Sequence, residues 1–370
     1  MIKTNRTLRT PYYQYSPRRL EQNIQEFNKF EENGIDVFYA IKANNYQPLV
    51  LRMIEAGYGF DIASKEELLF VNKLGANMAK VSFSAPTKLE ADLQEASNLG
   101  VRYYAFDSVE EIKKILKNTK SPKLFARMSV RNKEASFNLS ENFGMTEAYF
   151  VSVLKKAKKY KWPICGLTFH VGSQNVSVSS WRKALKDMAR LVRIAQEYGI
   201  KITFVNVGGG IPVPYNNGVK PTSYFVNSIC KQILRFKRVN NIENVFIEPG
   251  RALSANTMVL FTKVVNIKSF KRPPILVVDL SVFNGLIEPL EHFEYPVFEY
   301  KSQDMKNGEI KKKNYQICGI SCDGYDIIKR QCLLPADIKV DDILIIPFAG
   351  AYSFVYENFH MRKFPEIYTE

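Results

Sequence analysis

The stretch DVFYAIKANNYQPLVLRMIEAGYGFDIASKEELLFVNKLG, residues 36–75, contains the pattern that decides the fold. An apolar, β-rich run over 36–41 precedes a helix-like segment over 47–57. A second such run over 58–62 precedes a second helical segment over 64–75. This alternation is typical of parallel strands that are joined by crossover helices.

The same unit continues along the chain, and the sequence predicts strands over 36–41, 58–62, 80–84, 102–106, 123–128, 165–170, 202–207 and 244–248. Helical periodicity separates these runs, most clearly at 181–199, where apolar residues recur every three or four positions. Eight such units predict a (β/α)8 TIM barrel, an α/β fold whose active site opens at the carboxyl ends of the strands. A doubly wound open sheet is the alternative.

The sequence changes character near residue 252, after which β-rich runs show little helical periodicity. We therefore expect the barrel over 16–252 and a C-terminal, mostly antiparallel β-sandwich or β-barrel domain over 253–370. The N-terminal segment 1–15 is expected to pair with this β domain.

Composition narrows the functional classes. The 370 residues are 46% hydrophobic and 24% charged, as in globular proteins, and no apolar run predicts a membrane span or a secretory leader. Five scattered cysteines without a CxxC pair indicate a cytoplasmic protein, and three histidines without ligand spacing predict no metal site. The net charge of +15 lacks a nucleic-acid-binding signature, so we expect a basic solvated surface and no nucleic-acid partner.

Polar residues of unusual kinds lie at the predicted carboxyl ends of the strands. They are Lys42, Asp61, the segment SAPTK (84–88), Arg127, His170, Ser173, Gly208, Gly209, Gly210, Glu248, Gly250 and Arg251. Each alone has an ordinary structural explanation, such as a surface lysine or a glycine turn. Their joint placement where a barrel carries its active site favours a functional role.

These residue types fit one ligand. A glycine-rich loop with Arg251 and Ser173 can bind a phosphate. His170 can lie on a ring face, and Glu248 can keep a ring nitrogen protonated. Lys42, partly desolvated at a strand end, can form an imine with an aldehyde. A phosphate, a protonated heterocycle and an aldehyde together describe pyridoxal 5′-phosphate.

Seven motifs extend the pattern in order from residue 39 to 354: YAIKAN, FDIAS, FHVGSQ, VGGGIP, IEPGR, CDGYD and AGAYSF. On these motifs the chain resembles the fold-type III pyridoxal-phosphate decarboxylases, which include the ornithine, arginine and diaminopimelate decarboxylases. The resemblance implies a carboxy-lyase of amino-acid metabolism, such as polyamine biosynthesis, that works as a head-to-tail homodimer with shared active sites.

The resemblance also implies residue roles. Lys42 carries the cofactor as an imine, His170 stacks on its ring and Glu248 pairs with the ring nitrogen. Cys322, from the other subunit, protonates the decarboxylated carbon, and Asp323 contacts the distal end of the substrate. The remaining cofactor-binding residues are Asp61, Arg127, Ser173, Gly209, Gly210, Gly250, Arg251 and Tyr352.

The segment VFNGLIEPLEHF, residues 282–293, aligns best with the substrate loop of the diaminopimelate decarboxylases. Where this chain has Glu288, those enzymes have an arginine. They have a tyrosine in place of His292 and a glutamate in place of Asp323. Because Glu288 reverses the charge that grips a distal carboxylate, we predict that Glu288, His292 and Asp323 bind a cationic distal group, as in ornithine, lysine or arginine of L or D configuration.

Several alternatives stay open. The alternative substrates are diaminopimelate and an amino-acid conjugate of a siderophore or antibiotic pathway. A more remote alternative is an inactive regulatory homologue. Glu288 either contacts the substrate or pairs with a neighbouring arginine such as Arg362.

Overall fold

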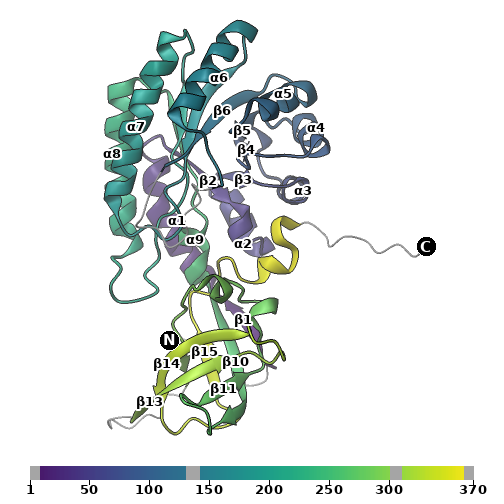
Figure 1. The fold of residues 1–370 in the computed structure, drawn as a ribbon, viewed down its shortest axis with the longest axis vertical. Helices are drawn as coiled ribbons and strands as arrows, with labels where there is room; N and C mark the ends of the chain where they lie inside the picture. Colours follow the sequence, from purple (N-terminus) through teal and green to yellow (C-terminus); the bar gives the residue numbers. More distant parts are fainter. Residues whose placement is uncertain (1–8, 131–141, 301–310, 362–370) are drawn as a thin grey trace, which may run out of the picture. The chain divides into compact units, whose positions relative to one another are not determined.

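The structure, a computed structural model, describes residues 9–130, 142–300 and 311–361 (Figure 1). Residues 1–8 of the predicted N-terminal segment and residues 362–370, with Arg362, lie outside these ranges. The chain divides into two compact units. We call Glu21–Leu253 the barrel unit, and the described residues up to Leu20 together with Ser254–Glu357 the β unit.

The barrel unit contains a closed parallel sheet whose strands follow the order of the sequence. The strands are β2 (Asp36–Ala40), β3 (Gly59–Ile62), β4 (Val81–Phe83), β5 (Tyr103–Phe106), β6 (Lys123–Met128), β7 (Ile164–Phe169), β8 (Phe204–Asn206) and β9 (Asn244–Ile247). Strand β9 pairs with β2, with Asp36 opposite Phe246 and Val37 opposite Ile247. The predicted TIM-like barrel is confirmed, and the open-sheet alternative is wrong because the first and last strands are hydrogen-bonded.

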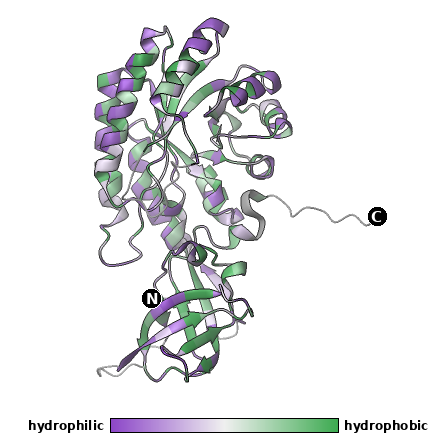
Figure 2. Ribbon diagram, viewed as in Figure 1, coloured by the Kyte–Doolittle hydropathy of each residue, from purple (hydrophilic) through white to green (hydrophobic). Residues whose placement is uncertain are grey.

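Helices alternate with the strands and flank the barrel, α1 preceding the first barrel strand (Figure 1). They are α1 (Pro17–Glu31), α2 (Gln47–Glu55), α3 (Lys65–Lys73), α4 (Glu90–Asn98), α5 (Val109–Asn118), α6 (Glu147–Tyr160), α7 (Val178–Glu197), α8 (Thr222–Asn240) and the short α9 (Arg251–Ser254). Ser64 and Ser108 cap α3 and α5 by accepting a backbone N–H three residues on. The helices alternate hydrophobic and hydrophilic residues, as expected when one face packs inward (Figure 2).

Aromatic side chains fill part of the barrel interior. A buried cluster contains Phe38, Phe125, Phe204, Phe246 and Ala105. The rings of Phe38 and Phe246 lie 4.6 Å apart between centroids. The barrel is therefore a packed core, so ligands must bind at its ends.

The β unit is built on one sheet with the strand order β12–β15–β10–β11–β13–β14, and β1 pairs with β10. Its strands are β1 (Tyr12–Tyr15), β10 (Met258–Lys268), β11 (Ile275–Val278), β12 (Phe298–Glu299), β13 (Lys312–Cys318), β14 (Ile327–Pro335) and β15 (Ile343–Ile346). The pairings are antiparallel except between β11 and β13. The expected mostly antiparallel β domain is confirmed.

In the ranges that the structure describes, no helix combines the length and the apolar character that crossing a membrane requires.

Candidate active site

Five predicted side chains come from five different strands to the same end of the barrel. Lys42 lies in the short 3-10 helix directly after β2, Asp61 in β3 and Arg127 in β6. His170 directly follows β7, and Glu248 directly follows β9. The carboxyl ends of barrel strands form one rim. Lys42 and His170 therefore share one site although they are 128 positions apart in the sequence.

Lys42 and Asp61 form an ion pair in which Nζ lies 3.2 Å from Oδ2. The Asp61 side chain is buried, whereas that of Lys42 is 35% exposed, so its amine stays accessible. The other Asp61 oxygen, Oδ1, is buried and has no hydrogen-bond partner among the described residues. An unsatisfied buried acceptor costs free energy, so this oxygen marks a place where a bound molecule can complete the site.

Glu248 is held by donors from two separate parts of the barrel, the residue after β4 and the end of β8. Its Oε1 accepts hydrogen bonds from Ser84 Oγ and Asn206 Nδ2, each at 2.5 Å. Burial, followed by the charge of Asp61, raises the pKa of Glu248 to about 7, although Ser84, Lys42 and Asn206 act in the opposite direction. A carboxyl group with this pKa can share a proton with a basic ring nitrogen near neutral pH.

His170 is a neutral imidazole. Its Nδ1 accepts a hydrogen bond of 2.9 Å from the backbone N–H of Gly172, which places the ring proton on Nε2. Burial, and then the positive charges of Arg127 and Lys42, lower the pKa of His170 to about 3. The flat, uncharged ring is suited to stacking on a heterocycle.

Arg127 is the second cation near the rim. Burial lowers its pKa, while the carboxylates of Glu248, Asp61 and Asp107 act to raise it. Its guanidinium lies 5.1 Å from the ring centroid of Phe143. Lys42 and Arg127 therefore lie within electrostatic range of Glu248, and both also interact with Asp61.

Three consecutive glycines after β8 let two loops approach each other. Gly208 and Gly210 have positive φ angles of 63° and 97°. A Cβ atom on Gly210 would lie 2.3 Å from the carbonyl oxygen of Gly172, and one on Gly209 would lie 2.4 Å from that of Glu248. Only glycine permits this backbone contact, which leaves a cradle that side chains cannot fill.

Arg251 adds a fixed cation beside this cradle. Its Nε donates to Ser173 Oγ at 3.3 Å, and its Nη1 donates to Tyr215 Oη at 3.1 Å. The residue is buried and follows Gly250. A buried guanidinium, a hydroxyl and a glycine loop together suit a phosphate group.

The β unit holds the other predicted residues. Glu288 is 3% exposed and accepts a hydrogen bond of 2.5 Å from Tyr295 Oη. His292 is exposed and has a φ angle of 63°, and Tyr352 also has a left-handed backbone with φ of 51°. The role of Glu288 in substrate binding stays a prediction.

Cys322 is exposed in the loop with the sequence CDGYD, and hydrogen bonds to the Asp326 carboxylate fix the backbone of this loop. The buried Asp326 carboxylate accepts the backbone N–H groups of Val282 at 2.9 Å and Ser321 at 3.0 Å. Asp323 accepts the N–H of the residue two positions on, which closes a local turn. The loop therefore presents a thiol and a carboxylate on a backbone of defined shape.

Three side chains of the barrel site had no predicted role: Ser84, Asn206 and Tyr215. Asn206 carried the clearest signal, because a fully buried amide in an otherwise apolar strand needs a partner. Ser84 lies in the strand-end segment SAPTK, but no local pattern connects it with Glu248, 164 positions away. Tyr215 carried no signal in the sequence.

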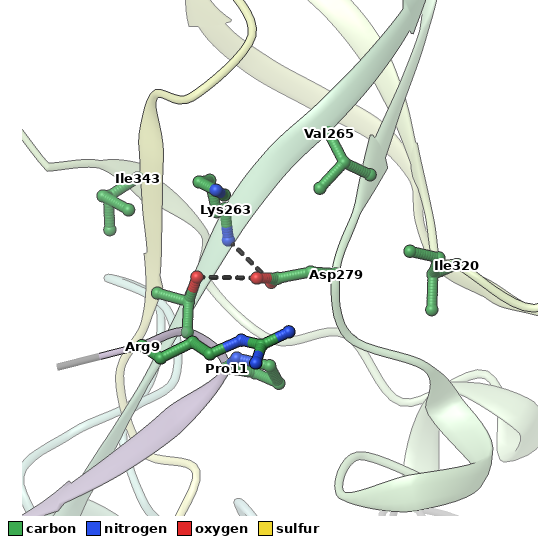
Figure 3. A pocket seen from close by; sticks show the side chains of 8 residues that line it. Arg9, Pro11, Lys263, Val265, Asp279, Ile320 and Ile343 are labelled. Atoms are coloured by element: carbon green, nitrogen blue, oxygen red, sulfur yellow. Dashed lines mark hydrogen bonds between the residues drawn. The ribbon is translucent and has the colours of Figure 1, made fainter.

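A cavity of about 760 Å³ lies within the β unit, and no predicted site residue lines it (Figure 3). Its Asp279 carboxylate accepts hydrogen bonds from Thr10 Oγ1 at 2.6 Å, Thr262 Oγ1 at 2.7 Å and the backbone N–H of Lys263 at 2.9 Å. This carboxylate ties the segment before β1 to β10 (Figure 3). We interpret it as a structural clamp rather than a catalytic group.

Comparisons with known proteins agree with this geometry. The family model described as pyridoxal-dependent decarboxylase, pyridoxal binding domain, matches residues 18–255. A lysine/ornithine decarboxylase of Selenomonas ruminantium is 30% identical over 350 residues, which cover 94% of this chain and 86% of that protein. A diaminopimelate decarboxylase of Archaeoglobus fulgidus is 27% identical over 366 residues, covering 94% and 84%.

Among solved structures, the arginine decarboxylase of Paramecium bursaria Chlorella virus, bound to agmatine, superposes with a TM-score of 0.86. The two sequences are 25% identical, and the match covers 95% of this chain and 93% of the viral chain.

Proposed function

Because the chain belongs to the pyridoxal-dependent decarboxylase family, we propose that its substrate is a basic amino acid with a cationic distal group, namely ornithine, lysine or arginine of L or D configuration. The protein is a carboxy-lyase of amino-acid metabolism, and its cofactor is pyridoxal 5′-phosphate. The bacterial lysine/ornithine and viral arginine decarboxylases, named for such substrates, support the proposal.

The barrel site fits this cofactor. The glycine cradle and Arg251 suit its phosphate. Asp61 Oδ1 can accept a hydrogen bond from the bound cofactor, and the Lys42 side chain is partly exposed. When bound, pyridoxal 5′-phosphate supplies an electrophilic aldehyde and an electron-accepting ring. The acid and base groups around it belong to the protein.

In the proposed arrangement, Lys42 holds the cofactor through its amine, and Glu248 holds a proton at the ring nitrogen. His170 stacks as a neutral ring, while Ser173 and Arg251 bind the phosphate. By keeping that proton in place, Glu248 would hold the ring in its electron-accepting form, which favours the loss of carbon dioxide. Asp61, Arg127, Gly209, Gly210, Gly250 and Tyr352 complete the proposed cofactor contacts.

The proposed active unit is a head-to-tail homodimer with two shared sites. In this unit Cys322 delivers a proton from Sγ to the α-carbon, and Asp323 contacts the distal group. The exposure of Cys322 on a loop that Asp326 fixes supports this role. All five cysteines are free of disulfides, which supports the proposed cytoplasmic location.

The charge of one segment of the β unit carries the substrate proposal. Residues 273–300 contain four glutamates, one aspartate and no lysine or arginine, in a chain with a net charge of +15. Glu288 lies in this segment. A carboxylate there attracts a cationic distal group and repels the second carboxylate of diaminopimelate.

We expect the Glu288→Gln variant to lose roughly 10- to 100-fold in kcat/KM for its cationic substrate, because a desolvated charge pair is broken. The amide keeps an acceptor for Tyr295 Oη, so folding should be preserved. Carbon dioxide release from lysine, ornithine and arginine measures the effect, with diaminopimelate as the anionic comparison.

Glu291→Gln is the matched control, because Glu291 lies in the same 3-10 helix but is exposed. It should change kcat/KM less than about twofold, as expected for a screened surface charge. Equal losses in the two variants would refute a specific role for Glu288. A wild-type preference for diaminopimelate would favour the alternative substrate, which the Archaeoglobus relative represents.

A further inference from the structure

We propose that Ser84 and Asn206 are positioning residues, which hold one oxygen of Glu248 and leave its other oxygen to accept from the cofactor's ring nitrogen. The inference rests on the proposed role of Glu248. Both side chains are buried, Ser84 with 7% and Asn206 with 0% exposure. Neither side chain contributes chemistry of its own.

The hydrogen bonds to Glu248 are asymmetric. Both donors, at 2.5 Å, end on Oε1. Among the described residues, Oε2 accepts no hydrogen bond. Two donors from two strands fix the rotation of the carboxyl plane, so that Oε2 remains the acceptor for a ring N–H.

The surrounding network determines which way each donor points. Asn206 Oδ1 accepts the backbone N–H of Gly208 at 2.9 Å, so Nδ2 must face Glu248. Ser84 Oγ has one proton, which it gives to the ionised Glu248, so Ser82 Oγ, at 2.6 Å, donates to Ser84. Asn206 thereby connects the glycine loop to the carboxylate.

Charged groups on other strands act on the same carboxylate. Asp61 favours protonation of Glu248, whereas Lys42 and Arg127 favour its ionised form. Ser84 and Asn206 donate to the ionised form, so they oppose burial and Asp61. Loss of either donor shifts Glu248 toward the neutral acid, which cannot serve as a full counter-charge to a protonated ring.

The test is a carbon-13 NMR titration of the Glu248 carboxyl in the cofactor-free protein with labelled glutamate, the signal being assigned with Glu248→Gln. The wild-type carboxyl should titrate near its pKa of about 7. Ser84→Ala should raise the midpoint by about one pH unit, the scale of one hydrogen bond to a charge. Asn206→Ala should give a shift of the same sign.

Ser84→Thr retains the hydroxyl and should restore the wild-type midpoint, while Ser82→Ala should give a smaller shift than Ser84→Ala. With cofactor bound, the acidic limb of the plot of kcat against pH should move to higher pH in Ser84→Ala, because activity requires the ionised Glu248 carboxylate. An unchanged midpoint in folded Ser84→Ala would overturn the proposal, as would a shifted midpoint with an unchanged kcat profile. A protein that shows the NMR shift but decarboxylates no amino acid would instead refute the proposed function.

Discussion

Replacement of Lys42 by alanine is expected to lower decarboxylation by ~10³-fold or more, the scale on which loss of a covalent nucleophile acts. Lys42 is the accessible amine at the barrel rim, 35% exposed and 3.2 Å from Asp61. Without it, the cofactor is held by non-covalent contacts alone. Borohydride reduction followed by mass spectrometry should label wild-type Lys42 with the cofactor and leave the variant unlabelled.

Two further variants separate charge from chemistry. Lys42→Arg keeps a cation beside Asp61 but cannot form an imine, so it should be as inactive as alanine. Lys73→Ala removes an exposed lysine of α3 and should leave both labelling and turnover unchanged. Substantial turnover by Lys42→Arg would show that the amine is not the attachment point.

Replacement of Glu248 by glutamine is expected to lower kcat by roughly 10²- to 10³-fold, as when one preorganised electrostatic group is lost. The amide oxygen can still accept from Ser84 and Asn206 in place of Oε1. The amide nitrogen then occupies the position of Oε2 and cannot accept a ring N–H. The ring nitrogen loses its counter-charge, while the site keeps its shape.

The two predictions differ in their effect on attachment. In Glu248→Gln, borohydride reduction should still label Lys42 with the cofactor. The acidic limb of the plot of kcat against pH should disappear in this variant. The sign follows from the raised pKa of about 7: the carboxylate is lost as the pH falls through this value, and with it the activity. A kcat within threefold of wild type would mean that Glu248 does not control the ring nitrogen.

The barrel could be predicted from the sequence because its signals are local. Apolar runs such as VFYA mark strands, and amphipathic segments such as residues 181–199 mark helices. Once eight such units are counted, closure places Lys42, His170 and Glu248 on one rim. The rim arrangement therefore followed from the order of the elements, without knowledge of any side-chain contact.

The hydrogen bonds that tune the site could not be predicted. Ser84 lies 164 positions from Glu248 and Asn206 lies 42, and no local pattern tells which carboxylate oxygen they contact. The burial of Glu288 against Tyr295 depends on the path of an irregular loop. Such contacts arise from tertiary packing, so residue type and local sequence pattern alone do not predict them.

Carbon dioxide release by the purified protein with pyridoxal phosphate tests the central claim most directly. The panel contains L- and D-ornithine, L- and D-lysine, L- and D-arginine, and meso-diaminopimelate. We predict turnover of at least one cationic amino acid, with kcat/KM above that for diaminopimelate by ~100-fold or more, since a misplaced charge costs several kcal/mol. Turnover of diaminopimelate alone, or of no member of the panel, would contradict the account.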